Sequence, residues 1–259
     1  MLLISLIILW SIGLGLASGF LAGLLGVGGG LIIVPALLWL LPHYGYPINH
    51  SYHAALATSL ASIIITSSLS AWAHQKRKGI VWAHIQALSL PIAIGAILGG
   101  WVATSVPDTF LRSLFVIFAL FMGWRLQQAT TSLDSASPPM PLKSVRPIGM
   151  GIGLISSWIG IGGGSLSVPL LLRQGLPMQQ AVGTSALLGL IIALPASIGF
   201  ICTSGNIPHL PAYSVGFIYL PALLGISLGS VLSTQIGAAW AHRLPRLVLK
   251  RIFSYLLYI

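Results

Sequence analysis

The feature that most constrains this chain is a glycine-rich segment that occurs twice in apolar surroundings. Residues 26–35 read GVGGGLIIVP, and residues 160–169 read GIGGGSLSVP. Further matches follow in the same order: HAALATS at 53–59 with QQAVGTS at 179–185, and LPxxxGxxxG at 90–99 and again at 220–229. Two equivalent halves that each begin with helix-breaking residues inside a hydrophobic stretch are typical of membrane transporters, which build a central site between them.

The composition indicates a polytopic membrane protein. The chain is 56% hydrophobic and 5% charged, and residues 85–106 carry no charge. A helix that crosses about 30 Å of hydrocarbon needs about 20 residues. The segments that fit are 54–73, 86–105, 180–202 and 214–236, and less well 110–126 and 247–259. Because the apolar runs are continuous rather than alternating, they predict helices and not a β-barrel.

The charged residues predict the orientation of the chain. Twelve are basic and two are acidic, and the basic residues lie in short loops beside apolar segments. This pattern is the positive-inside bias and not a nucleic-acid surface. Lys76, Arg173 and Arg243 mark cytoplasmic loops, whereas loops 42–53 and 203–213 contain no Lys or Arg. The first half therefore runs outside, inside, outside, and the second half runs in the opposite sense.

These patterns predict an all-α polytopic fold made of two inverted repeats. The first repeat is expected over 1–126 and the second over 148–259, with a polar Pro/Ser-rich cytoplasmic linker over 127–147. Residues 148–172 are too few for two full crossings, so we expect a broken hairpin with its apex at Gly160 to Gly164. Each repeat then has one glycine-broken hairpin and about three transmembrane helices, which makes about 8–10 hydrophobic segments in all. Whether residues 1–14 complete a crossing in the first hairpin is left open.

The hairpin apexes are the candidate substrate site. Glycines permit sharp turns, and N–H groups at a helix start can bind an anion. Thr and Ser add hydroxyl donors without the cost of a buried charge. The expected binding residues are Gly28, Gly29, Gly30, Thr58, Ser59, Gly162, Gly163, Gly164, Thr184 and Ser185. In contrast, four glycines spaced four apart are expected to serve helix packing: Gly95, Gly99, Gly225 and Gly229.

At these residues the chain resembles the TauE/SafE family of sulfite-exporter-like transporters. The resemblance rests on the two glycine-rich segments, each followed by Val-Pro, and on AVGTS at 181–185; the first half has Ala57 where glycine is usual. It extends from about Gly15 to Phe253. It implies a multi-pass permease of the inner (plasma) membrane for small organic or inorganic anions, often sulfur-containing, such as sulfite or sulfonates. The implied partners are a small anionic substrate, the lipid bilayer and a possible second copy of the chain.

The sequence argues against an enzyme and against a metal or cofactor site. Asp108 and Asp134 are the two acidic residues, so neither a facing pair of membrane carboxylates nor a His-Glu-x-x-His motif is present. His50 and His53 lie one helical turn apart but have no nearby cysteine or carboxylate in the sequence, so we interpret them as interfacial or pH-responsive rather than metal-binding. We expect no cofactor. The alternatives to a permease that alternates access between its repeats are an anion channel and a non-transporting membrane scaffold.

Overall fold

The protein is an all-α membrane protein. Its computed structural model describes residues 2–26, 28–43, 46–47, 50–128, 140–205, 211–241 and 243–244. The elements are α1 (Leu2–Leu25), α2 (Gly30–His43), α3 (Ser51–Gln75), α4 (Trp82–Ala103), α5 (Asp108–Gln128), α6 (Leu142–Ile159), α7 (Gly164–Arg173), α8 (Met178–Thr203), β1 (Ser214–Val215), β2 (Ile218–Tyr219) and α9 (Leu220–Ala241). Among the described residues, α1, α3, α4, α8 and α9 are long and apolar enough to cross a membrane. The prediction of a polytopic helical protein is confirmed.

The surface and the interior have the polarity expected of a protein in lipid. Large apolar side chains such as Trp101, Ile117 and Leu232 are more than half exposed. The interior contains many small hydroxyl side chains, including the buried Ser62 and Thr66 of α3. The apolar exterior is solvated by lipid. In the interior, Ser and Thr allow close contact and hydrogen bonding between helices.

Two helix pairs depend on glycine. Helix α1 packs along α9, and α6 packs along α4. A Cβ built on Gly99 would lie 2.8 Å from the carbonyl oxygen of Leu154 in α6, and one on Gly225 would lie 2.5 Å from the Cβ of Ser11 in α1. Cβ atoms on Gly95 and Gly229 would collide with the backbone of the same partner helices. The prediction that these four glycines serve packing is confirmed.

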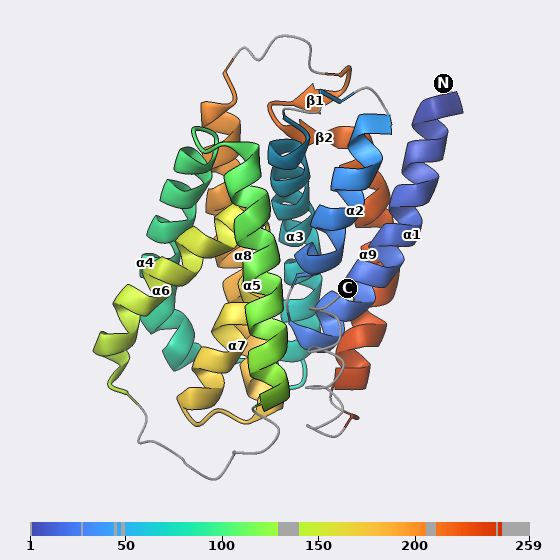
Figure 1. Cartoon of the computed structure of the whole chain (residues 1–259). Helices are drawn as coiled ribbons and strands as arrows, with labels where there is room; N and C mark the ends of the chain where they lie inside the picture. Colours follow the sequence, from blue (N-terminus) through green and yellow to red (C-terminus); the bar gives the residue numbers. More distant parts are fainter. Residues whose placement is uncertain are drawn as a thin grey trace.

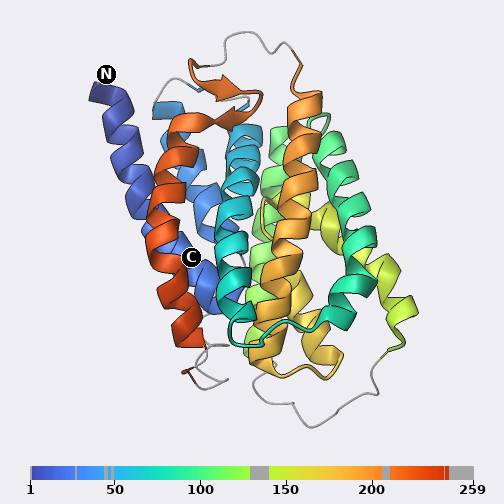
Figure 2. The same cartoon turned by 180° about the vertical axis from the view of Figure 1, so that it is seen from behind.

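The centre of the bundle is formed by α3 and α8, which pack against each other (Figures 1 and 2). Helix α2 packs on α3, and α7 packs on α8. If α1 corresponds to α6 and α4 to α9, as the repeated sequence suggests, the α1–α9 and α6–α4 pairs are equivalent. This arrangement supports two related halves, and the inverted relation between them stays a prediction.

Each half contains a broken hairpin. In Figure 1, α1 and α2 join at an apex that points away from the end marked N, and α6 and α7 enter from the opposite end. Helix α1 has 24 residues, which is about 36 Å, so residues 2–14 belong to a helix of full crossing length. Helix α7 has 10 residues, which is about 15 Å and reaches only part of the way through a bilayer.

Three element boundaries differ from the prediction. Residues 214–219, expected within a transmembrane helix, form the β1–β2 hairpin, and α9 begins at Leu220. Tyr213 and Gly216 have φ values of 68° and 56°, which a right-handed helix cannot contain. Helix α6 begins at Leu142, inside the segment predicted as linker, and α5 continues to Gln128. Residues 129–139 of that linker, and the predicted segment 247–259, lie outside the described residues.

Candidate functional site

Each hairpin turns at glycines in left-handed backbone conformations. Gly28 and Gly29 have φ values of 78° and 81°, and Gly160 and Gly163 have φ values of 72° and 69°. A side chain at such a position strains the backbone, whereas glycine adopts the conformation readily. The repeated glycines are therefore needed by the turns themselves.

The two apexes contact each other in the interior. A Cβ built on Gly28 would lie 3.3 Å from the Cα of Gly162, and one on Gly30 would collide with the carbonyl oxygen of Gly160. The side chain of Ile192 in α8 lies directly against Gly163. The backbones of the two hairpins approach this closely only because neither carries side chains at the contact.

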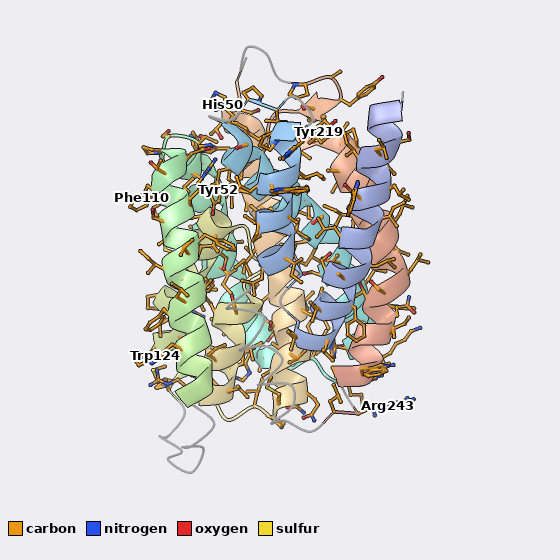
Figure 3. The ribbon with its side chains drawn as sticks, turned by 45° about the vertical axis from the view of Figure 1, so that its right-hand side comes forward. His50, Tyr52, Phe110, Trp124, Tyr219 and Arg243 are labelled. Atoms are coloured by element: carbon orange, nitrogen blue, oxygen red, sulfur yellow. The ribbon has the colours of Figure 1, made fainter. Side chains whose placement is uncertain are left out.

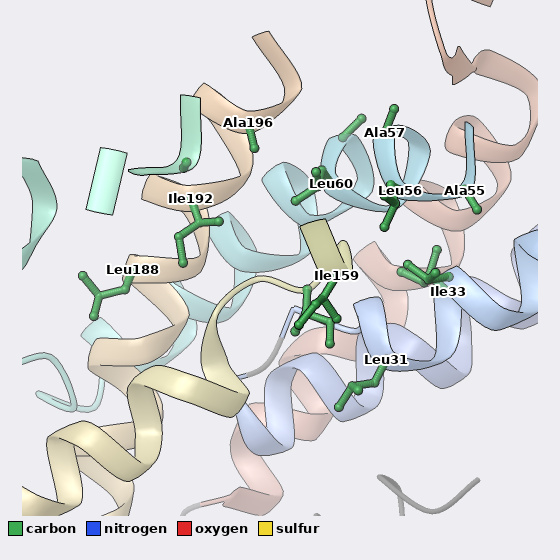
Figure 4. Packing of buried hydrophobic residues seen from close by; sticks show 14 of the residues in the cluster. Leu31, Ile33, Ala55, Leu56, Ala57, Leu60, Ile159, Leu188, Ile192 and Ala196 are labelled. Carbon is green, nitrogen blue, oxygen red and sulfur yellow. The ribbon is translucent and has the colours of Figure 1, made fainter. Parts of the chain in front are cut away.

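The walls around the apexes are largely apolar. Figure 4 shows Ile159, at the end of α6, among buried side chains of α2 and α3 that include Leu31 and Leu56. Leu188 and Ile192 of α8 belong to the same cluster. Polar groups in this region are consequently backbone amides and hydroxyls.

Two of the predicted hydroxyls bind the apex of the opposite half. Ser59 in α3 donates a hydrogen bond to the carbonyl oxygen of Gly160 over 2.8 Å. Ser185 in α8 donates to the carbonyl oxygen of Gly26 over 2.9 Å. Both side chains are fully buried. The two bonds are reciprocal, because each half holds the glycine turn of the other.

The two predicted threonines also cross between the halves. Thr58 accepts a hydrogen bond from the N–H of Tyr219 over 3.0 Å, and Thr184 accepts one from the N–H of Val81 over 3.0 Å. Tyr219 directly precedes α9, and Val81 directly precedes α4. The threonine oxygens therefore satisfy N–H groups where a helix of the opposite half begins.

The structure brings Gly28 and Gly30 of the first turn against Gly162 and Gly160 of the second, but it gives the predicted hydroxyls partners within the protein. The sequence had suggested Thr58, Ser59, Thr184 and Ser185 as donors to an anion. The protons of Ser59 and Ser185 point to carbonyl oxygens in this conformation, and the threonine oxygens accept from amides. Their contact with a substrate stays a proposal.

Three further serines near the second apex escaped the sequence reasoning. Ser67, Ser156 and Ser165 are each 1% exposed, and their hydroxyl oxygens have no hydrogen-bond partner among the described residues. A signal existed in the repeat, because Ser156 lies four residues before Gly160, where the first half has Ala22 four residues before Gly26. Likewise Ser165 follows Gly164, where Leu31 follows Gly30.

A charged cluster lies away from the apexes, at the start of α3. His53 forms an ion pair with Asp108 through Nδ1, and its Nε2 lies 3.0 Å from the carbonyl oxygen of Ala103. The N–H of Tyr52 donates to Asp108 over 3.3 Å, and Arg112 lies 3.5 Å from the same carboxylate. The described residues contain no group of three or more potential metal ligands. The cluster joins α3, α4 and α5. It pairs His53 with the carboxylate of Asp108, a contact that the sequence had not suggested.

Aromatic side chains cover the same end of the bundle. His53 stacks on Phe217 of the β1–β2 turn at 5.3 Å, and Tyr46 meets Tyr219 edge-on at 6.1 Å. Burial raises the pKa of Tyr46 to about 12, so its phenol is neutral at physiological pH. Figure 3 shows His50, Tyr52 and Tyr219 at this end and Arg243 at the other. The β-hairpin of the second half thus closes over the start of α3 in the first.

Comparison with known proteins gives a match over almost the whole chain. The family model described as sulfite exporter TauE/SafE matches residues 11–259. A probable membrane transporter protein of Haemophilus influenzae is 35% identical over 248 residues, covering 94% of this chain and 92% of the relative. A probable membrane transporter protein of Methanocaldococcus jannaschii is 26% identical, covering 86% of this chain and 82% of the relative. No solved structure matches the chain.

Proposed function

The chain belongs to the TauE/SafE family of membrane transporter proteins, and from this premise we propose that it is a permease for a small anion, organic or inorganic and containing sulfur, such as sulfite or a sulfonate. It is a multi-pass membrane protein. The inner (plasma) membrane as its location, and alternating access between two inverted repeats as its mechanism, are part of the proposal.

The observation that carries the proposal is the meeting of two glycine turns, one from each half, in the buried interior. Each turn leads into a helix, α2 or α7, whose first N–H groups have no acceptor within that helix. Irregular backbone at membrane depth is tolerated where it is covered by protein or lines an aqueous cavity. In broken-helix transporters such helix starts point at the anionic group of the substrate.

The site we propose is neutral and rich in donors. Its backbone comes from Gly28, Gly29, Gly30, Gly162, Gly163 and Gly164, and its predicted hydroxyls from Thr58, Ser59, Thr184 and Ser185. Helix N-termini attract negative charge because the peptide dipoles add along the axis. An anion can thus bind without a buried Lys or Arg, whose insertion would cost about 2.5–3.5 kcal/mol at the bilayer centre.

Alternating access would require one half to move against the other at the apexes. The reciprocal bonds of Ser59 and Ser185 and the aromatic cover around Phe217 hold the halves together in the present conformation. Opening at the His50 end would separate Phe217 from His53. The serine protons would then become available to a substrate that approaches the apexes.

The proposal is tested by transport in liposomes. Purified protein is reconstituted, and uptake of ³⁵S-labelled sulfite, sulfate, thiosulfate and methanesulfonate is measured with and without unlabelled anion inside the vesicles. A carrier gives saturable uptake that is accelerated by internal substrate, whereas a channel gives flux without this exchange. Absence of flux for all four anions in folded protein contradicts the proposal and favours a scaffold.

The apex is tested with a matched pair of glycine variants. Gly163→Ala adds a methyl group that collides with Ile192, and Gly175→Ala adds one into open space; both positions have positive φ, 69° and 84°. Because the added methyl group must displace the Cδ1 end of the Ile192 side chain, we expect Gly163→Ala to lower uptake and Gly175→Ala to retain most of it. Equal loss in both variants would show that backbone strain, and not the apex, limits transport.

A further inference from the structure

Unsatisfied hydroxyls gather at the second glycine turn and not at the first. We define the apex serines as Ser67 of α3, Ser156 of α6 and Ser165 of α7. All three are 99% buried, and none of their hydroxyl oxygens has a hydrogen-bond partner among the described residues. A buried hydroxyl without a partner is destabilising, because it has lost its water and gained no replacement.

Distances tie the apex serines to the second turn. A Cβ built on Gly189 would lie 2.8 Å from the hydroxyl oxygen of Ser67 and 2.7 Å from the carbonyl oxygen of Gly162, so these two groups border the same small space. A Cβ built on Gly163 would lie 3.5 Å from the hydroxyl oxygen of Ser156. Ser165 is the second residue of α7, directly after Gly164.

The start of α7 adds amide donors at the same place. The N–H groups of Leu166 and Ser167 both donate to the carbonyl oxygen of Gly163, over 3.0 Å and 2.7 Å. Among the described residues no acceptor is found for the N–H groups of Gly164 and Ser165. Gly163 at the N-cap provides no side chain to cap them. Hydroxyl and amide donors therefore surround one helix start that has no acceptor of its own.

The first turn has a similar helix start, where the N–H groups of Ile32 and Ile33 donate to the carbonyl oxygen of Gly29, but among the described residues it lacks the unpartnered hydroxyls. Thr66 donates to the carbonyl oxygen of Gly28 over 3.1 Å, and Ser70 donates to that of Ala22 over 3.3 Å. The residue that corresponds to Ser156 is Ala22, and the one that corresponds to Ser165 is Leu31. The hydroxyls near the first turn are thus used within the protein, and two of the positions are apolar.

We propose that the apex serines bind the transported anion directly, so that the anion lies against the start of α7 rather than midway between the two turns. This inference rests on the proposed function and adds the residues that hold the substrate. The ligand class is a small oxyanion, whose several oxygen atoms can accept from the three hydroxyls and from the N–H groups of Gly164 and Ser165.

The inference is tested by comparing unpartnered serines with a partnered one. Ser67→Ala, Ser156→Ala and Ser165→Ala are assayed for ³⁵S-sulfite and ³⁵S-methanesulfonate uptake and for melting temperature in detergent. Ser11→Ala is the matched control, because Ser11 is also buried and unpartnered but lies at the α1–α9 contact. Ser157→Ala is the structural control, since Ser157 donates to Ala96 and Gly153 over 3.0 Å and 2.9 Å.

We expect each apex variant to raise the KM for the transported anion tenfold or more, which is the loss of one hydrogen bond to a charged group. Its melting temperature without anion should be unchanged or higher, and the stabilisation by added anion should shrink. Ser157→Ala should lower the melting temperature and leave KM unchanged, and Ser11→Ala should leave KM unchanged.

The outcomes separate the two proposals. Wild-type uptake with unchanged KM in all three apex variants overturns this inference and leaves the transporter intact. A lower melting temperature in the apex variants, with an unchanged KM, also overturns it, because the serines would then be structural. No anion uptake or anion-induced stabilisation in folded wild type overturns the proposed function and this inference with it.

Discussion

At the scale of single residues, the acidic Asp108 serves three neighbours. It pairs with His53, accepts the N–H of Tyr52 and lies 3.5 Å from Arg112. Both ring nitrogens of His53 lie against oxygen atoms, Nδ1 against Asp108 and Nε2 against the carbonyl of Ala103. Asp108 therefore holds the start of α5 on the start of α3.

Replacing Asp108 by Asn should destabilise the protein markedly. The variant leaves His53 buried opposite an uncharged amide, and breaking a buried pair in this way costs about 3 kcal/mol. Arg112→Gln is the control, because the Arg112 side chain is 37% exposed and its pair contributes under about 1 kcal/mol. Thermal unfolding in detergent measures the stability of both variants. Equal losses of stability would contradict the buried-pair interpretation.

At the scale of elements, the hairpins are held by hydroxyls of the opposite half. Ser59 binds the carbonyl of Gly160 and Ser185 that of Gly26, so neither hairpin is secured by its own repeat alone. The first hairpin is also held within its own half, because Thr66 donates to the carbonyl oxygen of Gly28 and Ser70 donates to that of Ala22. The hydrogen bonds of Ser59 and Ser185 hold the halves against each other, so both would have to change when the halves move.

The reciprocal bonds predict matched effects of two substitutions. Ser59→Ala and Ser185→Ala should each destabilise the protein by about 1 kcal/mol, since each leaves one buried carbonyl unsatisfied. Ser68→Ala, which removes an exposed hydroxyl bonded to its own helix at Ile64, should have almost no effect. Unfolding curves of the three variants measure these changes in stability. A loss of stability in only one of the two buried-serine variants would argue against reciprocity.

At the scale of the whole molecule, the main contacts cross between the two halves. Helix α1 packs along α9, α6 along α4, and α3 against α8. Lys76, Arg77 and Lys78 lie in the loop after α3, which the sequence assigns to the cytoplasm, and the end that carries Arg243 in Figure 3 is opposite the end that carries His50. Arg112, in contrast, lies in α5 beside Asp108. The bundle is thus polarised along the axis that the positive-inside rule orients.

Single cysteines test this orientation in both halves. In a Cys202→Ser background, Ser105→Cys and Ala212→Cys should react with a membrane-impermeant maleimide in intact cells. Gln75→Cys and Arg173→Cys should react only after permeabilisation, because their loops are predicted to be cytoplasmic. All four native side chains are exposed. Labelling of one outer and one inner site from the same side would contradict the inverted repeats.

The sequence alone was sufficient for the membrane class, most of the helices, the broken hairpins and the packing glycines. These features depend on local chemistry: the length of apolar runs, the conformations that glycine permits, and spacings of four residues on a helix. A glycine turn such as that at Gly163 can be recognised from its own segment.

Only the tertiary structure decided the partners of the buried polar groups. The acceptor of Ser59 lies 101 residues away, and that of Ser185 lies 159 residues away, so no local pattern specifies them. The same holds for the His53–Asp108 pair and for the unpartnered hydroxyl of Ser156. A hydroxyl hydrogen-bonds whichever group the fold places within about 3 Å of it, and for Ser59 and Ser185 that group belongs to the opposite half.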